Sequence, residues 1–417
     1  MNGIPSTETS TAVVQRRTLR LLFATQIVSG MGYAVGSSVG ALLAAELAGV
    51  SLSGLAQSSA VVGGALAAIP ATAIVHRRGR RPSLAAAYGV ATIGALIVVW
   101  AAIHHSLLFL FLGYFLFGAG TAANLQARYT AVDLAPADRR GRHLSLIVWA
   151  TTIGAVAGPL LAAPAGIALA PYGIPPLAAP FAFSALLFIL TAVTLLALLR
   201  PDPALLAGTA GGSGERRGLA DGLRAVLARG PAILGITSVA VGHMVMVGLM
   251  AMTPVHIRSA GHDAAHTLRI VGVVISVHVA GMYAFAPAIG WLTDRIGRRP
   301  VIFAGILLLL AACALAGGAG YDNVRLGAGL FTVGLGWSCT MVAGSTLLTE
   351  TVPLELRASA QGLSDLLMGL AGASAGALSG VVVSAWEYSG LALVAAIATL
   401  PLAVLLLNQR RIVTTSR

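Results

Sequence analysis

Between two long apolar runs the chain carries the cationic stretch Gly290-Trp-Leu-Thr-Asp-Arg-Ile-Gly-Arg-Arg-Pro-Val-Ile302. A fainter copy lies 218 residues earlier, Thr72-Ala-Ile-Val-His-Arg-Arg-Gly-Arg-Arg-Pro-Ser-Leu84. A loop this short and this rich in arginine stays on the cytoplasmic side of a membrane and joins two membrane helices tightly. The two copies therefore predict a membrane protein built from an internal repeat.

The composition supports a membrane protein. Hydrophobic residues make up 57% of the 417 residues and charged residues only 10%, whereas about 25% of residues are charged in soluble domains. Apolar runs of about 20 residues recur along the whole length, and each is long enough to span a bilayer. The 50 glycines suit close helix packing in lipid, where small residues let backbones approach. We therefore expect an integral membrane protein.

The net charge of +12 has an uneven distribution along the chain. If the N-terminus is cytoplasmic, every basic residue except Arg258, Arg269 and Arg325 lies at or near a cytoplasmic segment. This is the positive-inside rule, which sets topology rather than a ligand. We expect no nucleic-acid partner, and a multi-pass protein of the plasma (inner) membrane with both termini in the cytoplasm.

Twelve apolar segments are expected to be helices. They divide the chain into a cytoplasmic N-terminal tail (1–17), a six-helix half (18–200), a cytoplasmic linker (201–230), a second six-helix half (231–408) and a cytoplasmic tail (409–417). In the linker, Leu219, Leu223, Val226 and Leu227 have helical spacing opposite arginines. That pattern fits a short helix on the membrane surface, or equally a solvated connector.

The repeat extends beyond the loops. Asp133, Pro136, Asp138 and Arg140 follow the fourth segment, and Glu350, Pro353, Glu355 and Arg357 follow the tenth at an offset of 217. Gly154 and Gly158 match Gly372 and Gly376 at an offset of 218. Three matches at nearly one offset indicate two halves in parallel repeat.

The loop motif resembles that of the major facilitator superfamily, which occurs between helices two and three and again between eight and nine. The second copy keeps the family's Gly, Asp and Gly-Arg-Arg, whereas the first has Thr72 for Gly and His76 for Asp. The resemblance covers about residues 18 to 408. It implies an all-α membrane protein with twelve transmembrane helices in two six-helix pseudo-symmetric halves.

The resemblance also implies a gate. In relatives, the loop motif latches the cytoplasmic side in one state of an alternating-access cycle. Arg298 and Arg299 are expected to pair with Glu350, and Arg80 and Arg81 with Asp133, while Asp294 faces a helix N-terminus. The candidate gating residues are His76, Arg77, Arg80, Arg81, Asp133, Asp294, Arg295, Arg298, Arg299, Glu350 and Arg357. The alternative is that these arginines only set orientation.

Helix five carries Gly154-x-x-x-Gly158-Pro159, which resembles the Gly-Pro signature of drug/proton antiporters. These three residues are the candidate hinge, because a Gly-Pro step is close-packed and bendable. Small-residue packing alone would also explain the pattern. Two features depart from the antiporter pattern: Ala162 and Ala163 replace the trailing glycines, and Tyr114 stands where helix four of such antiporters has Arg.

By resemblance, helices one, four, seven and ten line a central cavity. Polar residues of helix one share one face, and helix seven carries several methionines, which make an adaptable apolar pocket together with a few aromatic residues. The candidate substrate-binding residues are Gln26, Tyr33, Asn124, Gln126, His243, Met246 and Trp337. The mostly apolar lining favours a hydrophobic or amphipathic solute.

Ionisable groups at membrane depth are costly and usually functional. Asp365 lies about 10 Å into helix eleven at 1.5 Å per residue, and His243 and His278 lie near the middles of helices seven and eight. These three are the candidate proton-coupling residues, with Asp365 first because its burial would raise the pKa of a carboxyl group. The alternative for Asp365 is a permanent ion pair with Arg128.

We interpret the chain as a secondary active transporter that moves a small organic solute, hydrophobic or drug-like, by proton-coupled export. The alternatives are proton-coupled uptake of a metabolite or vitamin-like solute, and a transport-dead membrane sensor. The expected partners are the solute, protons and the lipid bilayer, with the protein a monomer. The sequence shows neither a nucleotide-binding loop nor a catalytic triad, which argues against a primary pump. We expect no enzymatic activity, no cofactor and no metal site.

Overall fold

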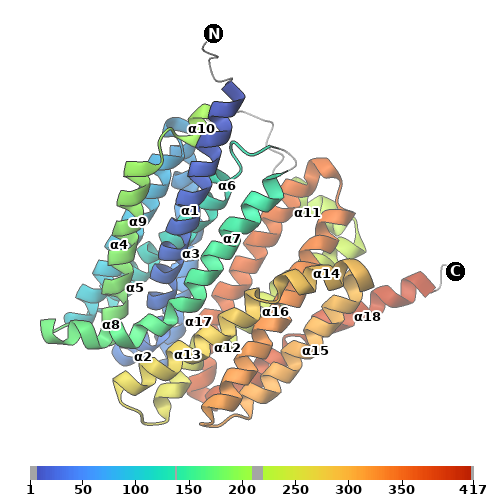
Figure 1. Cartoon of the computed structure of the whole chain (residues 1–417). Coiled ribbons are helices and arrows are strands. Elements are labelled where there is room, and N and C mark those ends of the chain that lie inside the picture. The colour runs from blue at the N-terminus through green and yellow to red at the C-terminus, as the bar shows by residue number, and fades with distance from the viewer. Residues whose placement is uncertain (1–6, 137–138, 209–218, 415–417) are drawn as a thin grey trace. The chain divides into compact units, whose positions relative to one another are not determined.

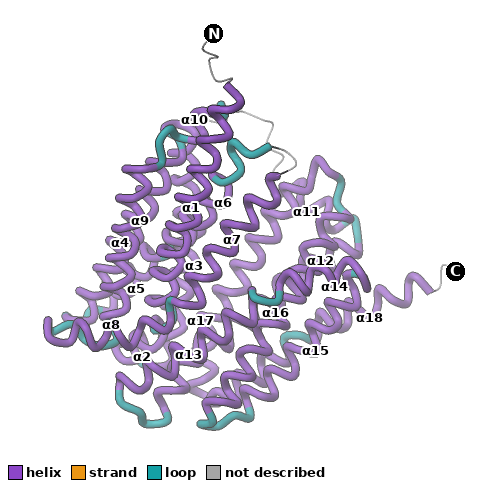
Figure 2. The backbone as a smooth tube through the Cα atoms, viewed as in Figure 1, coloured by secondary structure: helices purple, strands orange, loops and turns teal. Residues whose placement is uncertain are grey.

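The computed structural model describes residues 7–136, 139–208 and 219–414, and within them every regular element is a helix (Figures 1 and 2). Asp138 and residues 209–218 of the predicted linker lie outside the described residues. The elements are α1 (Thr7–Ser37), α2 (Gly40–Ala48), α3 (Val50–Arg78), α4 (Arg80–Ile103), α5 (Leu107–Phe117), α6 (Ala119–Thr130), α7 (Arg140–Ala157), η2 (Pro159–Leu161), α8 (Ala162–Leu169), η3 (Ala170–Tyr172), α9 (Ala179–Leu198), α10 (Pro203–Leu206), α11 (Leu219–Leu227), α12 (Gly230–Ser259), α13 (Ala264–Tyr283), α14 (Ala286–Ile296), α15 (Arg298–Gly317), α16 (Asn323–Thr351), η4 (Leu354–Leu356), α17 (Arg357–Ile397) and α18 (Leu400–Thr414).

Eleven helical segments of the described chain are long and apolar enough to cross a membrane. The last of them, Ser359–Asn408, has 50 residues, far more than the roughly 20 that one crossing needs. Its backbone leaves the helical region at Trp386 and Glu387, so the segment is two helices joined at a kink. Ten single segments and this double one give the twelve helices that the sequence predicts.

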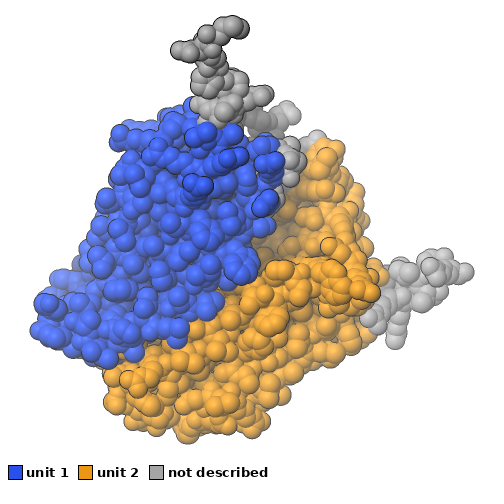
Figure 3. All heavy atoms as spheres, viewed as in Figure 1, with its two compact units in different colours: residues 1–39, 59–214 blue, residues 40–58, 215–417 orange. Residues whose placement is uncertain are grey.

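The chain forms two compact units, coloured separately in Figure 3. Unit 1 holds residues 1–39 and 59–214, and unit 2 holds residues 40–58 and 215–417. Helix α2 and the first nine residues of α3 thus belong to the same unit as the second half of the sequence. There, the Ser58 hydroxyl donates to the Ala373 carbonyl at 2.6 Å, and a Cβ on Gly54 would lie 1.8 Å from the Gly376 carbonyl oxygen. The start of α3 therefore crosses α17 with backbone against backbone.

Both copies of the cationic loop turn at a glycine that no other residue replaces without strain. Gly79 has φ +90° and Gly297 has φ +95°, each directly before the helix that follows the loop. L-residues with a side chain rarely adopt such a backbone, whereas glycine does so freely. The same turn occurs twice, 218 residues apart, as the sequence repeat predicts.

The candidate hinge lies where α1 and α7 of unit 1 approach closely. A Cβ on Gly154 would lie 2.2 Å from the Ile27 carbonyl oxygen, and one on Gly158 would lie 2.7 Å from Ala34 Cβ. Regular α-helix ends at Ala157, and Pro159 begins the 3-10 turn η2. The glycines therefore serve close packing, and bending at this point stays a prediction.

Replacing Gly154 with Val should disrupt the α1–α7 crossing, because the clashing atoms are backbone and cannot rotate away. We expect a loss of stability of about 3 kcal/mol, the upper part of the range for overpacking. Gly89→Ala is the matched control, since the added methyl on α4 would meet nothing within 4 Å. Thermal unfolding of purified protein in detergent would compare the two, and a wild-type midpoint for Gly154→Val would contradict the crossing.

Candidate functional site

An arginine–acid network closes the first cationic loop of unit 1. Arg80 Nε and Nη2 donate to the two carboxylate oxygens of Asp133 at 2.9 and 3.1 Å. Arg80 Nη1 donates to Gln126 Oε1 at 2.6 Å, and Gln126 Nε2 donates to Thr72 Oγ1 at 3.1 Å. The side chains of Arg80 and Asp133 are only 13% and 7% exposed. A bidentate pair between a guanidinium and a carboxylate is stronger and geometrically more specific than a single neutral hydrogen bond.

The second loop has the corresponding pair in unit 2. Arg298 Nε and Nη2 donate to the Glu350 carboxylate at 2.8 and 2.5 Å, and Nη1 donates to the Thr293 carbonyl at 3.1 Å. Asp294 lies at 3.5 Å from the same guanidinium. Here the acids are open to solvent, with Glu350 48% and Asp294 77% exposed. The repeat thus places equivalent pairs in unequal surroundings.

These contacts confirm the predicted pairing of Arg80 with Asp133 and of Arg298 with Glu350. The neighbouring arginines differ from expectation, because neither the Arg81 nor the Arg299 side chain bonds these acids within the described part of the chain. Among the other gating candidates, Arg295 lies over the Trp291 ring at 5.0 Å and Arg357 Nε donates to the Val352 carbonyl at 3.4 Å. His76 is half-buried and Arg77 is exposed.

Asp202, in the predicted linker, is a structural residue of the first loop that was not singled out from sequence. The Asp202 carboxylate accepts the backbone N–H of Arg80 at 3.1 Å and that of Arg81 at 2.8 Å, which are the first N–H groups of α4. It also accepts the Ala204 N–H at 3.0 Å, as the N-cap of α10. Such a cap stabilises by about 1 kcal/mol. The signal was present, since Asp directly before a proline at the first helical position is a typical helix start.

Two predicted substrate-binding residues, Gln26 and Asn124, meet in a buried hydrogen-bond cluster of unit 1. Gln26 Nε2 donates to the Tyr88 hydroxyl at 2.9 Å, and Tyr88 donates to Asn124 Oδ1 at 2.9 Å. Ser29 Oγ donates to the same Asn124 oxygen at 3.0 Å, and Thr151 Oγ1 donates to Gln26 Oε1 at 3.2 Å. These side chains tie α1, α4, α6 and α7 together. Tyr88 and Thr151 were not singled out from sequence, because neither lies on a helix expected to line the cavity.

In unit 2, His243 and Trp337 bond to each other. Trp337 Nε1 donates to His243 Nδ1 at 3.1 Å, and the Tyr283 ring lies edge-on to the indole at 5.6 Å. The imidazole packs on Gly372, where a Cβ would lie 2.7 Å from its Cδ2 atom. A residue larger than glycine at 372 would therefore displace the His243 ring.

The remaining substrate candidates differ in access. Tyr33 is half-buried and stacks on Phe117 with ring centroids 5.1 Å apart. Met246 is buried, and Gln126 is held in the Arg80 network rather than among the other cavity candidates. Ligand contact by any of these residues stays a prediction.

The three proton-coupling candidates have different surroundings. His278 is fully buried, and its Nδ1 lies 2.8 Å from the Leu330 carbonyl, which fits a neutral, structural imidazole. Asp365 is exposed on α17 rather than enclosed among the helices, and its role in proton coupling stays a prediction. Arg128, the proposed alternative partner of Asp365, has a buried Nε with no hydrogen-bond partner in the described part of the chain.

The family model described as Major Facilitator Superfamily matches residues 21–268 and 261–415. The chain belongs to the Major Facilitator Superfamily. It is 38% identical over 390 residues to the uncharacterized MFS-type transporter YdeG of Bacillus subtilis (strain 168), covering 92% of this chain and 90% of that protein. A second relative from the same organism, the uncharacterized MFS-type transporter YddS, is 36% identical over 393 residues, covering 92% of this chain and 89% of that protein.

A more distant relative is named for the solute that it transports. The riboflavin transporter RfnT of Brucella anthropi is 25% identical over 386 residues, covering 90% of this chain and 92% of that protein. Among solved structures, the nucleoside transporter NupG is similar with a TM-score of 0.75 and 17% identity, covering 95% of this chain and 98% of that one. The D-xylose-proton symporter is similar with a TM-score of 0.68 and 19% identity, covering 93% and 96%. These structures confirm the major facilitator fold.

The unequal burial of the two loop pairs predicts unequal costs of breaking them. Asp133→Ala strands a mostly buried guanidinium and should cost about 3 kcal/mol. Glu350→Ala breaks a pair that water already screens and should cost about 1 kcal/mol or less. Thermal unfolding of the two variants in one detergent would measure the difference, and equal losses would show that burial does not decide the strength of these pairs.

Proposed function

We propose that this chain is a proton-coupled secondary transporter that exports a small hydrophobic or drug-like organic solute by alternating access. Membership in the superfamily supports a secondary transporter. The solute class and the coupling ion are inferred from the residues of the site, and the direction from the resemblance of Gly154-x-x-x-Gly158-Pro159 to the Gly-Pro signature of drug/proton antiporters.

The hydrogen bond between Trp337 and His243 carries the proposal of proton coupling. An indole N–H only donates, so His243 Nδ1 must present its lone pair. The imidazole is then neutral with its single proton on Nε2. A second proton would put an N–H on Nδ1 against the N–H of Trp337, and the bond would break. Proton loading at His243 is therefore linked to a movement of the indole, which is what a coupled carrier needs.

Asp365 is the second proposed proton carrier. It lies seven residues before Gly372 on α17, which is nearly two turns and the same helix face, about 10 Å along the axis from the glycine under His243. Its carboxylate is exposed rather than enclosed among the helices. We infer that a proton passes between Asp365 and His243 along this face of α17.

The aromatic side chains around His243 in unit 2 favour a flat, amphipathic solute. The rings of Trp337 and Tyr283 lie edge to face there, with centroids 5.6 Å apart. Aromatic faces bind planar apolar groups, while a few placed polar atoms fix their orientation. Drug-like heteroaromatic compounds have this chemistry.

Uptake of a vitamin-like solute is the second candidate function. The relative named as a riboflavin transporter favours it, because riboflavin is also a planar heteroaromatic molecule. Proteoliposomes of known protein orientation separate the two directions. Solute that moves in the direction opposite to the protons supports export by exchange. Solute that moves in the same direction as the protons supports uptake. A protein that binds solute without any counterflow would be a sensor and would overturn both.

His243→Gln should uncouple the transporter. The glutamine carbonyl can still accept the Trp337 N–H, but the side chain cannot take up a proton. We expect counterflow of ethidium or riboflavin at equal pH to persist, and gradient-driven accumulation to fall about tenfold or more, as loss of a coupling energy of this order implies.

Trp337→Phe tests the same hydrogen bond from its donor side, since it keeps an aromatic ring and the titratable histidine but removes the N–H donor. It should also lower gradient-driven accumulation while keeping counterflow at equal pH, because protonation of His243 then no longer breaks a bond to the residue at position 337. Wild-type accumulation by His243→Gln would remove His243 from the coupling mechanism.

Asp365→Asn should likewise lose gradient-driven accumulation while keeping exchange at equal pH, because the neutral amide resembles the protonated acid. Asp365→Glu should retain part of the coupled activity. If Asp365 instead forms a structural ion pair with Arg128, Asp365→Asn should lose stability and exchange together, and neutralising Arg128 as well should rescue both. Full accumulation by Asp365→Asn would exclude the carboxylate as a carrier.

A further inference from the structure

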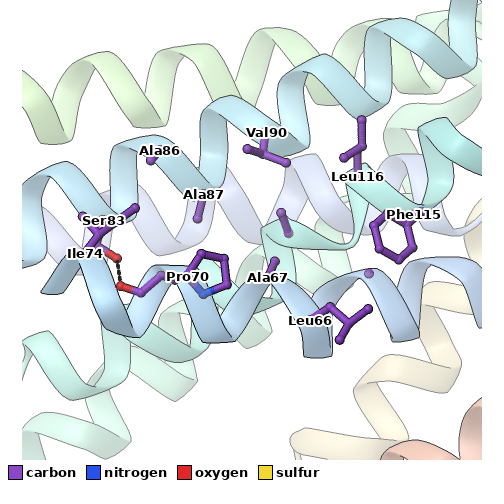
Figure 4. Close-up of a pocket in the computed structure, with 13 residues that line it drawn as sticks. Leu66, Ala67, Pro70, Ile74, Ser83, Ala86, Ala87, Val90, Phe115 and Leu116 are labelled. Carbon is purple, nitrogen blue, oxygen red and sulfur yellow. Dashed lines mark hydrogen bonds between the residues drawn. The ribbon is translucent and has the colours of Figure 1, made fainter. Parts of the chain in front are cut away.

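A groove on unit 1 lies outside the residues used so far. It runs between α3 and α4 over a floor from α5 and α6, encloses about 290 Å³, and is drawn in Figure 4. Its walls are small or apolar, with Ala67, Ala71, Ala86 and Ala87 leaving the space and Phe115 and Leu116 closing its floor. The only hydroxyl in its lining, Ser83, is already used, since it donates to the Ala71 carbonyl at 2.7 Å. The groove therefore suits a purely apolar occupant.

Small side chains and one proline form the walls of the groove. Pro70 lies inside α3 and lines the groove with its ring. On the facing side of α4, Ala86 and Ala87 have only a methyl group and do not fill the space. The groove therefore follows from the residue types that the sequence places there.

The length of the groove matches one leaflet of a membrane. Its α3 wall runs from Gly63 to Ile74, about 16 Å at 1.5 Å per residue. Half of a hydrocarbon core of about 30 Å is about 15 Å. The three helices that form most of its lining all belong to segments that can cross the membrane. An acyl chain lying along α3 would fill the groove from the headgroup level to the bilayer midplane.

A cationic site continues the same helix face at one end. Arg77 and Arg78 follow Ile74 by three and four residues, so they extend the α3 wall by one turn. Both side chains are exposed, and within the described residues neither has a hydrogen bond or an ion pair. The nearby Arg80 differs, because Asp133 and Gln126 occupy its guanidinium. Arginines without protein partners beside the end of an apolar groove fit a phosphate group.

We propose that this groove and Arg77–Arg78 form a binding site for one anionic phospholipid, with an acyl chain along Pro70 and the phosphate on the two guanidinium groups. Basic sites between membrane helices on the cytoplasmic side hold lipid headgroups in this way. The site is independent of the proposed solute and coupling residues, so it stands or falls separately from the transport mechanism. The first loop has a local excess of positive charge, because His76 replaces the usual acid. A bound phosphate group would balance that charge.

The test uses delipidated full-length protein in detergent, with thermal unfolding followed against added lipid and bound lipid counted by native mass spectrometry. Dioleoyl phosphatidylglycerol should stabilise the wild type more than dioleoyl phosphatidylcholine, which has the same chains. Glycerol 3-phosphate, which has the charge but no chains, should not stabilise it. Arg77→Gln with Arg78→Gln should weaken phosphatidylglycerol binding roughly thirty-fold, from about tenfold per 1.4 kcal/mol and about 1 kcal/mol per arginine.

Two controls make the result specific. Arg16→Gln with Arg17→Gln removes the same charge from exposed arginines of α1 and should leave the preference for phosphatidylglycerol intact. Ala87→Phe should fill the groove and abolish the preference with both arginines present, whereas Ala73→Phe on an exposed position of α3 outside the groove should not. Equal stabilisation by both lipids, equal loss in the two arginine variants, or a retained preference in Ala87→Phe would each overturn the proposal.

Discussion

The hydrocarbon core of a bilayer offers no hydrogen-bond partners, and this constraint shapes every part of the chain. Backbone groups at that depth must be satisfied inside the segment, which leaves the α-helix as the solution for a single chain crossing many times. Side chains obey the same rule. Buried Thr25, Thr191 and Thr253 donate back to carbonyls of their own helices, and the Gln26–Tyr88–Asn124 cluster satisfies its members mutually. A polar group at this depth that has no hydrogen-bond partner in the protein is therefore a candidate functional residue.

Helices that share no hydrophobic driving force in lipid must associate by close approach, and glycine supplies it. Gly154 against Ile27 in unit 1 and Gly54 against Gly376 in unit 2 are both backbone-to-backbone crossings. Such crossings are tight because no side chain separates the two backbones. Side-chain hydrogen bonds add to them, from Thr151 to Gln26 in unit 1 and from Ser58 to the Ala373 carbonyl in unit 2.

The two loop networks show how a repeat keeps its geometry while the surroundings of its residues diverge. Gly79 and Gly297 make the same turn, and Arg80 and Arg298 make the same fork to an acid. In the first loop, however, Thr72 accepts a hydrogen bond from Gln126, and Asp202 caps the helix that follows. The replacement of glycine by Thr72 thus belongs to a more buried and more extensively bonded network. The second loop keeps the family residues and leaves its acids open to water.

The sequence alone determined the class, the twelve helices, the two glycine turns and the pairing of Arg80 with Asp133 and Arg298 with Glu350. It could do so because hydropathy, charge and the positions of glycines can be read locally along the chain. The repeat then places equivalent residues of the two halves at a nearly fixed offset. Only the tertiary structure decided which residues share a site. In the folded chain His243 bonds to Trp337, Gln126 belongs to the network of the first loop, and Asp365 is exposed. Asp202 of the linker caps α4, and a groove lies beside Pro70. These outcomes depend on helix rotation and crossing, which set contacts between residues tens to hundreds of positions apart and leave no periodic mark in the chain.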